Sequence, residues 1–300
     1  MRPVMIEFIN NYLIPGLVLG SIYALGAIGV SMIYSILRFA HFAHGDLMTF
    51  GAYLAYAVVV ASGWPPLLAL PLAIVGTAGA TLFIDQLAYR PFRKSRPIVV
   101  VIASFGVALM IRAVIMLIWG VQPEPYVEGI QPPLESLQPF RIHEKHAVIV
   151  GTSLVLVAAL HLLLTRTKMG KAMRAMSDDA DLARVTGIGT ERVIAWTWIV
   201  GAVLAAAAGV LIAIDTQIKP TLGWDLLLPL FAAAILGGLG RPYGAILGGL
   251  VIGMIEELST YPLFGDQPLV TPGYKTGLAF AIMVIMLIWR PQGLLRGRVL

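Results

Sequence analysis

A group of polar residues interrupts the first long apolar part of the chain. His41 and His44 are three residues apart, and Gly45 and Asp46 follow them. Two imidazoles and a carboxylate at this spacing suit a metal site, but they equally suit the polar cap of a broken helix. Because a charged side chain is costly against lipid, we expect Asp46 to face the protein interior or a cavity. We interpret these four residues as the border of a transport pathway that holds no metal.

A second apolar segment, residues 226–255, is interrupted by glycines in the other half of the chain. Paired discontinuous segments, here 41–51 and 237–249, are the best sequence pointer to a transport site near the middle of the bilayer. The alternative is that small residues only let two membrane helices pack closely. The glycines that we assign to the pathway are Gly237, Gly238, Gly240 and Gly244.

The loop at residues 166–192 has the features of a docking element, and we call it the coupling loop. Ser177 is a good N-cap, with two aspartates in the turn after it, which favours a short helix over 178–186. Gly187 then ends that helix in the left-handed conformation. The loop is therefore suited to receive force from a protein on the cytoplasmic side, or else it is an amphipathic connector at the membrane surface.

One face of the coupling-loop helix is lined by small or short side chains. Asp179, Ala183 and Gly187 recur every four residues and share this face, and Leu182 lies beside it as an apolar contact. We assign these four residues to contact with an ATPase. A magnesium site for a lipid diphosphate is a third reading of the aspartates in this loop, but no second acidic cluster accompanies them on the same side of the membrane.

Motifs for covalent chemistry do not occur in the sequence. The chain has no cysteine, no G-x-x-x-x-G-K-[ST] phosphate loop, no H-E-x-x-H and no G-x-S-x-G. We therefore predict no catalytic residue, no metal and no cofactor on this chain. If ATP and magnesium drive its function, they bind to partner ATPase subunits.

The composition requires a membrane to surround these segments. Of 300 residues, 58% are hydrophobic and 12% are charged, and the mean hydropathy is +0.86. A soluble domain carries about 25% charged residues, so we predict a single all-α polytopic transmembrane domain over residues 1–300. A soluble enzyme or a nucleic-acid binder is excluded. About eight transmembrane helices are expected, with 226–255 either crossing twice or re-entering as a broken pair. The other spans are expected at 11–36, at two places within 47–84 separated by Trp64-Pro65-Pro66, and at 97–120, 147–165, 193–214 and 270–289.

Basic residues set the orientation that we expect. Lysine and arginine concentrate at 90–96, 166–192 and 290–298, and the positive-inside rule places such clusters in the cytoplasm. The N-terminus is then outside and the C-terminus is cytoplasmic. The isolated Arg112 lies nearer one end of its span than the middle, so we expect its side chain to reach the outer interface.

Four blocks of sequence resemble one known family. The first block contains Gly16-Leu17-Val18-Leu19-Gly20 and Phe39-Ala40-His41, and the second is the coupling loop. The third is the group of glycines at 237–249, and the fourth is Arg290-Pro291-Gln292-Gly293. In this order they are similar to permeases of the high-affinity branched-chain amino acid ABC transporters of the LivH type. His41 stands where that family commonly has asparagine, which leaves the contacts of this segment open.

The resemblance implies a permease subunit of an ATP-driven importer in the bacterial inner membrane, moving branched-chain or related small amino acids. It also implies a second related permease, two cytoplasmic ATP-binding subunits and an extracytoplasmic substrate-binding protein. The exact substrate, and whether the permease pair is made of identical or different chains, stay open. The alternative function is a channel or an ion-coupled carrier for a small polar solute such as urea or an amide, and a magnesium-dependent enzyme of lipid metabolism comes third.

Overall fold

The computed structural model describes residues 3–93, 95–126, 132–134, 138–262 and 267–295. Its regular elements are helices, and within the described ranges the backbone forms no β-strand, only one isolated bridge between Glu124 and Ile218. Lys94, Arg296 and Arg298 of the expected basic clusters lie outside the described residues. The helices are α1 (Pro3–Phe8), η1 (Ile9–Leu13), α2 (Ile14–Leu37), α3 (Ala43–Ser62), α4 (Pro66–Ile84), η2 (Asp85–Tyr89), η3 (Arg90–Phe92), α5 (Pro97–Trp119), α6 (Glu144–Arg166), α7 (Lys168–Asp178), α8 (Ala180–Val185), α9 (Thr190–Asp215), α10 (Leu222–Gly237), α11 (Pro242–Leu258), η5 (Pro272–Tyr274) and α12 (Lys275–Trp289).

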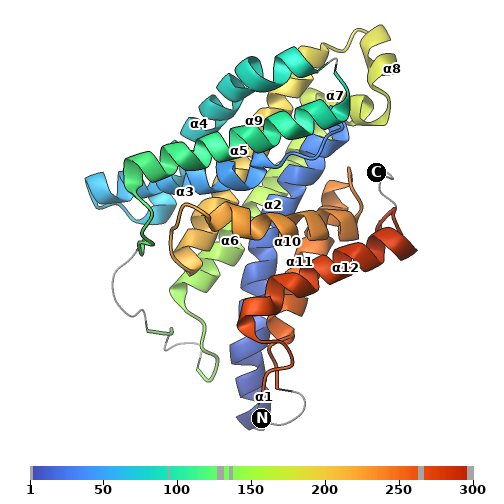
Figure 1. The fold of residues 1–300 in the computed structure, drawn as a ribbon. Helices are drawn as coiled ribbons and strands as arrows, with labels where there is room; N and C mark the ends of the chain where they lie inside the picture. The colour runs from blue at the N-terminus through green and yellow to red at the C-terminus, as the bar shows by residue number, and fades with distance from the viewer. Residues whose placement is uncertain (1–2, 94, 127–131, 135–137, 263–266, 296–300) are drawn as a thin grey trace.

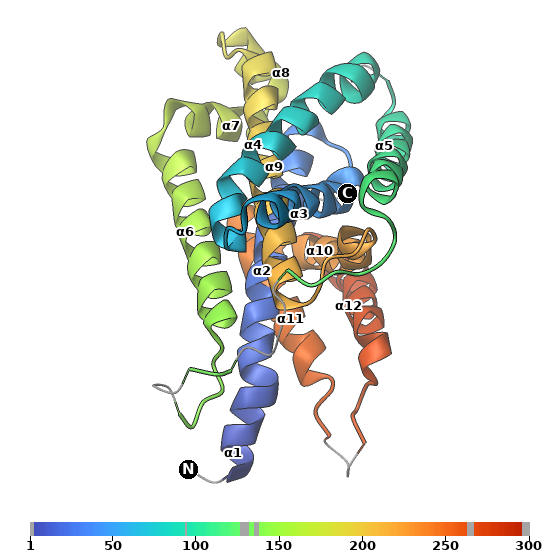
Figure 2. The same cartoon turned by 90° about the vertical axis from the view of Figure 1, so that its left-hand side faces the viewer.

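These helices form an all-α polytopic membrane protein. Among the described residues, seven helices are long and apolar enough to cross a bilayer, and α10 is a shorter apolar helix. The expected break at Trp64-Pro65-Pro66 is confirmed, because α3 ends at Ser62 and α4 begins with a proline at its first position. The N-terminus and the α7–α8 segment lie at opposite ends of the molecule in both views (Figures 1 and 2).

The segment 226–255 forms two helices joined by a short turn. α10 ends at Gly237 and α11 begins at Pro242, with Gly238 and Gly240 at φ 107° and φ 80° between them. At 1.5 Å per residue, the 16 residues of α10 extend over about 24 Å, less than the roughly 30 Å of a bilayer core. The broken pair that the sequence predicts is therefore present, with a short first member.

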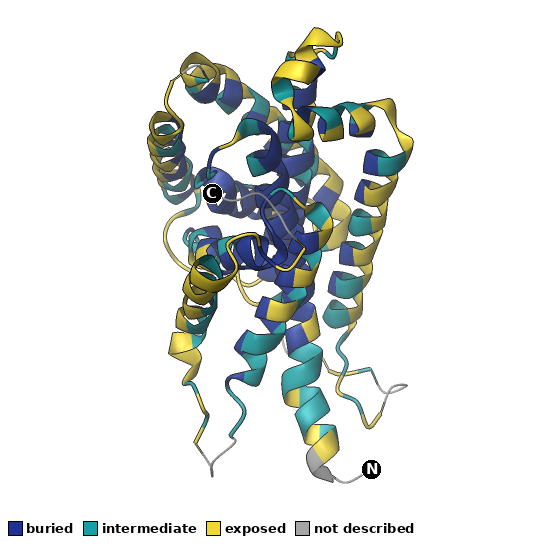
Figure 3. Ribbon diagram, turned by 90° about the vertical axis from the view of Figure 1, so that its right-hand side faces the viewer, coloured by how far each residue is buried: buried dark blue, intermediate teal, exposed yellow. Residues whose placement is uncertain are grey.

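The core of the bundle is made by α2, α9 and α10. Figure 3 shows the buried residues gathered in the middle of the molecule. In the apolar stretch of α9, 83% of residues are buried, whereas only 6% of residues are buried in the apolar stretch of Pro272–Trp289. α2 packs against α11 backbone to backbone. A Cβ atom on Gly253 would lie 2.4 Å from the Cα of Gly20, and one on Gly249 would lie 2.4 Å from the nitrogen of Ala24. Small residues therefore fix this pair, as is usual between membrane helices.

Candidate functional site

The chain turns sharply between α2 and α3, and the polar residues of the first broken segment lie in or just after this turn. Arg38 ends α2 with φ 61°, and α3 starts at Ala43. His41 is buried in the turn, where its Nε2 lies 3.0 Å from the hydroxyl of Tyr89. The His41 ring also makes an edge contact with Trp198, at 5.0 Å between centroids. An aromatic cluster from η2 and α9 thus holds this segment in place.

His44 lies one helical turn further and faces α2. It is fully buried, and a Cβ atom on Gly29 would lie 2.6 Å from its ring. The glycine therefore makes the space that the imidazole occupies. The rings of His41 and His44 are 6.0 Å apart between centroids. Within the described ranges, no group of three or more His, Cys, Asp or Glu side chains is placed to hold a metal ion.

Asp46 forms a buried ion pair with Arg112 of α5. The Nε and Nη2 atoms of Arg112 donate to the two carboxylate oxygens at 2.9 Å and 3.0 Å. The Asp46 side chain has 0% of its surface exposed and the Arg112 side chain 15%. The expectation that Arg112 reaches the outer interface is therefore wrong. A bidentate partner of opposite charge inside the bundle holds the guanidinium better than a position at the membrane surface.

The start of α10 completes this polar cluster. The guanidinium carbon of Arg112 lies 4.6 Å from the ring centroid of Trp224, a cation–π distance. α10 reaches this position because the backbones of Gly45 and Gly223 touch. A Cβ atom on Gly223 would lie 1.8 Å from the carbonyl oxygen of Gly45, and the Gly223 amide donates to Thr49 Oγ1 at 2.8 Å. Close packing of two glycines thus brings α3, α5 and α10 together around one charged pair.

The glycines of the second broken segment lie at the other end of α10. Gly237 and Gly244 pack backbone to backbone, since a Cβ atom on Gly237 would lie 2.0 Å from the Gly244 carbonyl oxygen. The Gly240 amide donates to Ser31 Oγ of α2 at 3.0 Å, and Gly238 supports the C-terminal segment at Gly293. About 20 Å along α10 separates Gly237 from Trp224, so the structure does not bring the two predicted groups into one site.

The coupling loop folds as two short helices instead of one. α7 starts after Thr167, whose Oγ1 accepts from the Gly170 amide at 2.9 Å, and it continues through Ser177 to Asp178. Asp179 caps the second helix, α8, where its Oδ1 accepts from the amides of Asp181 and Leu182 at 3.0 Å and 2.9 Å. The predicted helix start at Ser177 and the single helix over 178–186 are therefore wrong.

The end of α8 agrees with the sequence, and two of its exposed side chains are aliphatic. Gly187 has φ +87°, the left-handed value expected for the residue that ends the helix. Leu182 is 61% exposed and Val185 is 84% exposed, whereas Ala183 is buried. The helix therefore presents two aliphatic side chains outward and turns its small residue towards the protein.

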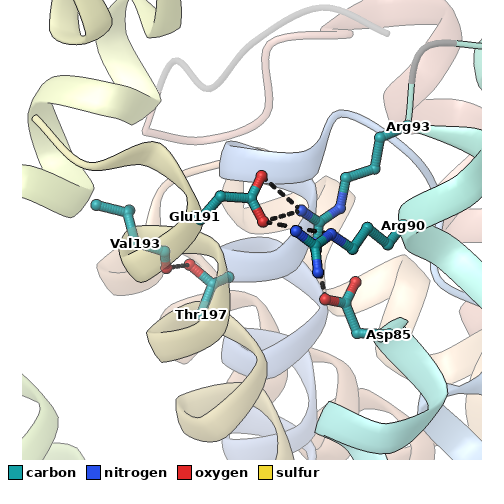
Figure 4. Close-up of polar contacts among 6 residues, drawn as sticks. All are labelled: Asp85, Arg90, Arg93, Glu191, Val193 and Thr197. Atoms are coloured by element: carbon teal, nitrogen blue, oxygen red, sulfur yellow. Dashed lines mark hydrogen bonds and ion pairs between the residues drawn. The ribbon is translucent and has the colours of Figure 1, made fainter. Parts of the chain in front are cut away.

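An arginine that we had assigned only to the orientation signal connects the coupling loop to η2. The Nη1 atom of Arg93 donates to both carboxylate oxygens of Glu191, at 3.0 Å and 2.8 Å, and its Nη2 atom contacts Oδ2 of Asp85 (Figure 4). Arg90 adds a weaker contact, with its Nε 3.9 Å from Glu191. Burial acts to lower the pKa of Arg93, but the two carboxylates outweigh it and raise that pKa. The guanidinium thus stays charged and joins η2 to the first turn of α9.

A second arginine links the coupling loop to α2. Arg38 Nη2 donates to the carbonyl oxygen of Ser177 in α7 at 2.7 Å. This contact, the bond from Arg112 to Asp46 and the bond from Arg93 to Glu191 are not visible in sequence patterns, because the partners are 66 to 139 residues apart.

Comparison with known proteins shows a consistent relationship along nearly the whole chain. A family model described as "Branched-chain amino acid transport system / permease component" matches residues 12–287. The chain is 31% identical to the high-affinity branched-chain amino acid transport system permease protein BraD of Pseudomonas aeruginosa, over 94% of each chain. It is 33% identical to the permease protein LivH of the same kind of system in Escherichia coli, over 93% of each chain.

A solved structure has the same fold at low sequence identity. It belongs to a transporter classed with the metal-chelate ABC type in an inward-facing conformation. The match has a TM-score of 0.53 and 13% identity, and it covers 94% of this chain and 88% of the other.

Proposed function

The chain belongs to the permease family of branched-chain amino acid transport systems, and from this premise we propose how it works. It is the membrane-spanning subunit of an ATP-driven ABC importer. Its cargo is branched-chain or related small amino acids, the substrates in the names of its relatives. It performs no covalent chemistry, and ATP with magnesium acts on separate subunits.

The observation that carries this proposal is the buried pair of Asp46 and Arg112 beside Trp224. A free amino acid is a zwitterion, so it needs a cation for its carboxylate and an anion for its ammonium group. Arg112 and Asp46 supply both inside a bundle whose other core side chains are largely apolar. As the substrate passes, each charge exchanges its partner in the pair for the complementary group of the substrate, and the ring of Trp224 borders the aliphatic side chain.

The two broken segments border this pathway at different depths. His41, His44 and Gly45 set the position of Asp46 at the start of α3. Gly238 and Gly240 lie in the turn at the far end of α10, and Gly237 and Gly244 flank it in α10 and α11. Because none of the four has a side chain, the α10–α11 hairpin shifts without side-chain clashes at these positions. α10 connects the polar segment around Asp46 to the glycine turn, so that its movement opens one end of the pathway as it closes the other end.

The coupling loop transmits the force of ATP hydrolysis. Leu182 and Val185 project from α8 with more than half of their surfaces exposed, and aliphatic side chains in this position favour a protein partner. Asp179 and Gly187 fix the two ends of α8, and the buried Ala183 anchors it to the rest of the loop. Movement of a docked ATPase therefore moves α8 as one body.

Two arginines extend this movement to the pathway. Arg38 connects α7 to the end of α2, directly before the turn that holds His41. Arg93 connects the first turn of α9 to η2, which carries Tyr89, the partner of His41. Both connections lead to the segment that positions Asp46.

The setting follows from the family and from the charge pattern. Residues 1–300 form a single permease domain in the bacterial inner membrane, with the N-terminus outside and the coupling loop at 166–192 and the C-terminus in the cytoplasm. It pairs with a second, related permease. Two cytoplasmic ATP-binding subunits and an extracytoplasmic substrate-binding protein complete the importer.

Purification of the chain from its native membrane tests this composition. We expect two ATP-binding subunits and a sister permease to co-purify, and ATP hydrolysis by the complex to rise when the substrate-loaded binding protein is added. A chain that purifies alone and passes urea or an amide into liposomes without nucleotide would show instead that it is a channel or carrier.

A further inference from the structure

A groove of about 240 Å³ lies between α4 and α5. Both helices pack against α3, which forms the floor, and the two walls meet where η2 contacts α5. From the turn that joins them, α4 and α5 diverge across α3 (Figure 2). Each described residue that lines the groove has an apolar side chain. The transport mechanism described above does not use this groove.

The groove is closed at its floor and open along its rim. Leu47 and Val107 are buried at the floor, whereas Phe83, Leu87 and Met110 expose about two thirds of their surfaces at the rim (65%, 66% and 67%). An occupant is therefore apolar where it contacts these walls. The volume is below the roughly 300–1,000 Å³ of drug-sized ligand sites, so it suits one hydrocarbon chain better than a compact ligand.

Two arginines lie at the end of the groove where the walls meet. Arg90 follows Phe83 and Leu87 at intervals of four and three residues, which places it on the same side of the helix. On the other wall, Arg96 precedes Val107 by eleven residues, close to three turns of α5. The row of groove-lining residues on each wall therefore ends in a positive charge.

Both of these guanidinium groups are accessible to a ligand. The Arg90 side chain is 61% exposed, and its contact with Glu191 is long, at 3.9 Å. Arg96 is exposed, and in the part of the chain that the structure describes it forms no ion pair. Arg93 lies between them but is occupied by Asp85 and Glu191. The turn thus keeps two positive charges that no close internal partner neutralises.

This combination discriminates between classes of occupant. A transmembrane helix of another chain would cover the apolar walls but bring no anion to the turn. A soluble anion such as phosphate would leave the walls uncovered, and a zwitterionic phospholipid would bring a cation beside the arginines. An anionic phospholipid satisfies both parts, because guanidinium groups bind phosphate and basic residues beside membrane helices attract anionic lipids.

We propose that one acyl chain of an anionic phospholipid lies in this groove, with the lipid phosphate at Arg90 and Arg96. Two lining residues, Leu47 and Ile111, are the sequence neighbours of the two members of the buried ion pair. The bound chain therefore supports α3 and α5 directly behind that pair. Arg93 connects the same turn to the first turn of α9, so the head group lies beside the coupling loop. The lipid is a ligand of the protein whatever solute is transported, so the inference goes beyond the proposed function and does not depend on it.

Photolabelling of the purified protein in phosphatidylcholine nanodiscs tests the site. The probe is phosphatidylglycerol with a photoreactive diazirine in the middle of its acyl chain. We expect it to label peptides of α4 and α5 that line the groove, and we expect unlabelled phosphatidylglycerol, but not added phosphatidylcholine, to compete. The double variant Arg90→Gln, Arg96→Gln removes the contacts to the phosphate and lowers this labelling about tenfold or more.

A second variant tests the apolar part of the site. Ala80→Trp places a large side chain in the groove from a half-buried lining position and abolishes labelling there. Its matched control is Gly79→Trp, one residue earlier and with open space around it. The control for charge is Arg166→Gln, Arg290→Gln, which removes two positive charges at the ends of α6 and α12. Both controls label like the wild type, and phosphatidylglycerol raises their melting temperatures but not those of the two groove variants.

Two results would overturn the inference. Labelling that spreads evenly over lipid-facing helices such as α12, and that phosphatidylcholine displaces as well as phosphatidylglycerol does, would show contact with bulk lipid only. Cross-links from the groove to a second membrane protein, with no lipid label there, would show a protein helix in its place. Neither measurement uses ATP or a transported solute, so failure of the lipid site leaves the proposed function intact, and failure of uptake leaves the lipid site intact.

Discussion

Removing the positive partner of the buried ion pair separates its structural role from its transport role. In Arg112→Met, a flexible apolar side chain replaces a guanidinium that makes two hydrogen bonds of 2.9 Å and 3.0 Å to Asp46. The carboxylate, with 0% of its side-chain surface exposed, is then buried without a counter-charge. Breaking one half of such a pair costs about 3–5 kcal/mol, so we expect a clear fall in thermal stability.

The double variant Asp46→Asn, Arg112→Met removes both charges. Because replacement of a whole buried pair is often close to neutral, we expect its stability to return to within about 1–2 kcal/mol of the wild type. Uptake of leucine stays low in both variants, since the substrate zwitterion no longer finds its charged partners. Leu109→Met on the exposed face of the same helix is the matched control, and it leaves stability and uptake unchanged.

The assays are thermal unfolding of the purified complex and leucine uptake into proteoliposomes. If the double variant recovered stability and uptake together, the pair would only fasten α3 to α5, and our pathway would be wrong. If Arg112→Met were as stable as the wild type, the argument from burial would fail.

Three further substitutions test other parts of the mechanism. Gly187→Val forces a β-branched residue into φ +87°, at a cost of about 1–2 kcal/mol, and we expect it to lower substrate-stimulated ATP hydrolysis. Gly189→Ala is the control and leaves this hydrolysis unchanged, because a Cβ atom there meets nothing closer than 3.8 Å. Gly249→Leu places side-chain atoms inside the α2–α11 contact and lowers the melting temperature of the purified protein, whereas Gly79→Leu, with open space around it, does not. Arg93→Gln removes the charge between α9 and η2 and lowers the number of substrate molecules transported per ATP hydrolysed, and an unchanged ratio would exclude this connection.

Much of the architecture could be predicted because its causes are local. Proline is unfavourable in a helix interior, and two successive prolines in Trp64-Pro65-Pro66 predict a break between two spans. The structure ends α3 at Ser62 and begins α4 at Pro66. A run without charged residues likewise predicts the position of a helix, as for the expected span 11–36 and the observed α2 at Ile14–Leu37.

The error in the coupling loop has a specific cause. Serine and aspartate are both good N-caps, so the sequence offers Ser177 and Asp179 as alternative helix starts. Thr167 caps an earlier helix, α7, which continues through Ser177 and ends at Asp178. Ser177 therefore lies inside a helix and does not begin one. The next cap is then Asp179.

The centre of the candidate site could not be predicted because it depends on tertiary packing. Asp46 was identified as an interior charge, but its partner is 66 residues away and the sequence contains no signal that joins them. Trp224 reaches this pair only because the backbones of Gly45 and Gly223 touch. Contacts between residues far apart in the chain depend on how the helices cross one another, which sequence patterns do not show.

ATP-driven leucine uptake into proteoliposomes, with all subunits present, tests the central claim most directly. We predict that the wild type accumulates leucine only when ATP and the loaded binding protein are both supplied, and that the double variant Asp46→Asn, Arg112→Met assembles but transports little. Leucine uptake that proceeds without ATP, or at the wild-type rate in the double variant, would contradict the account.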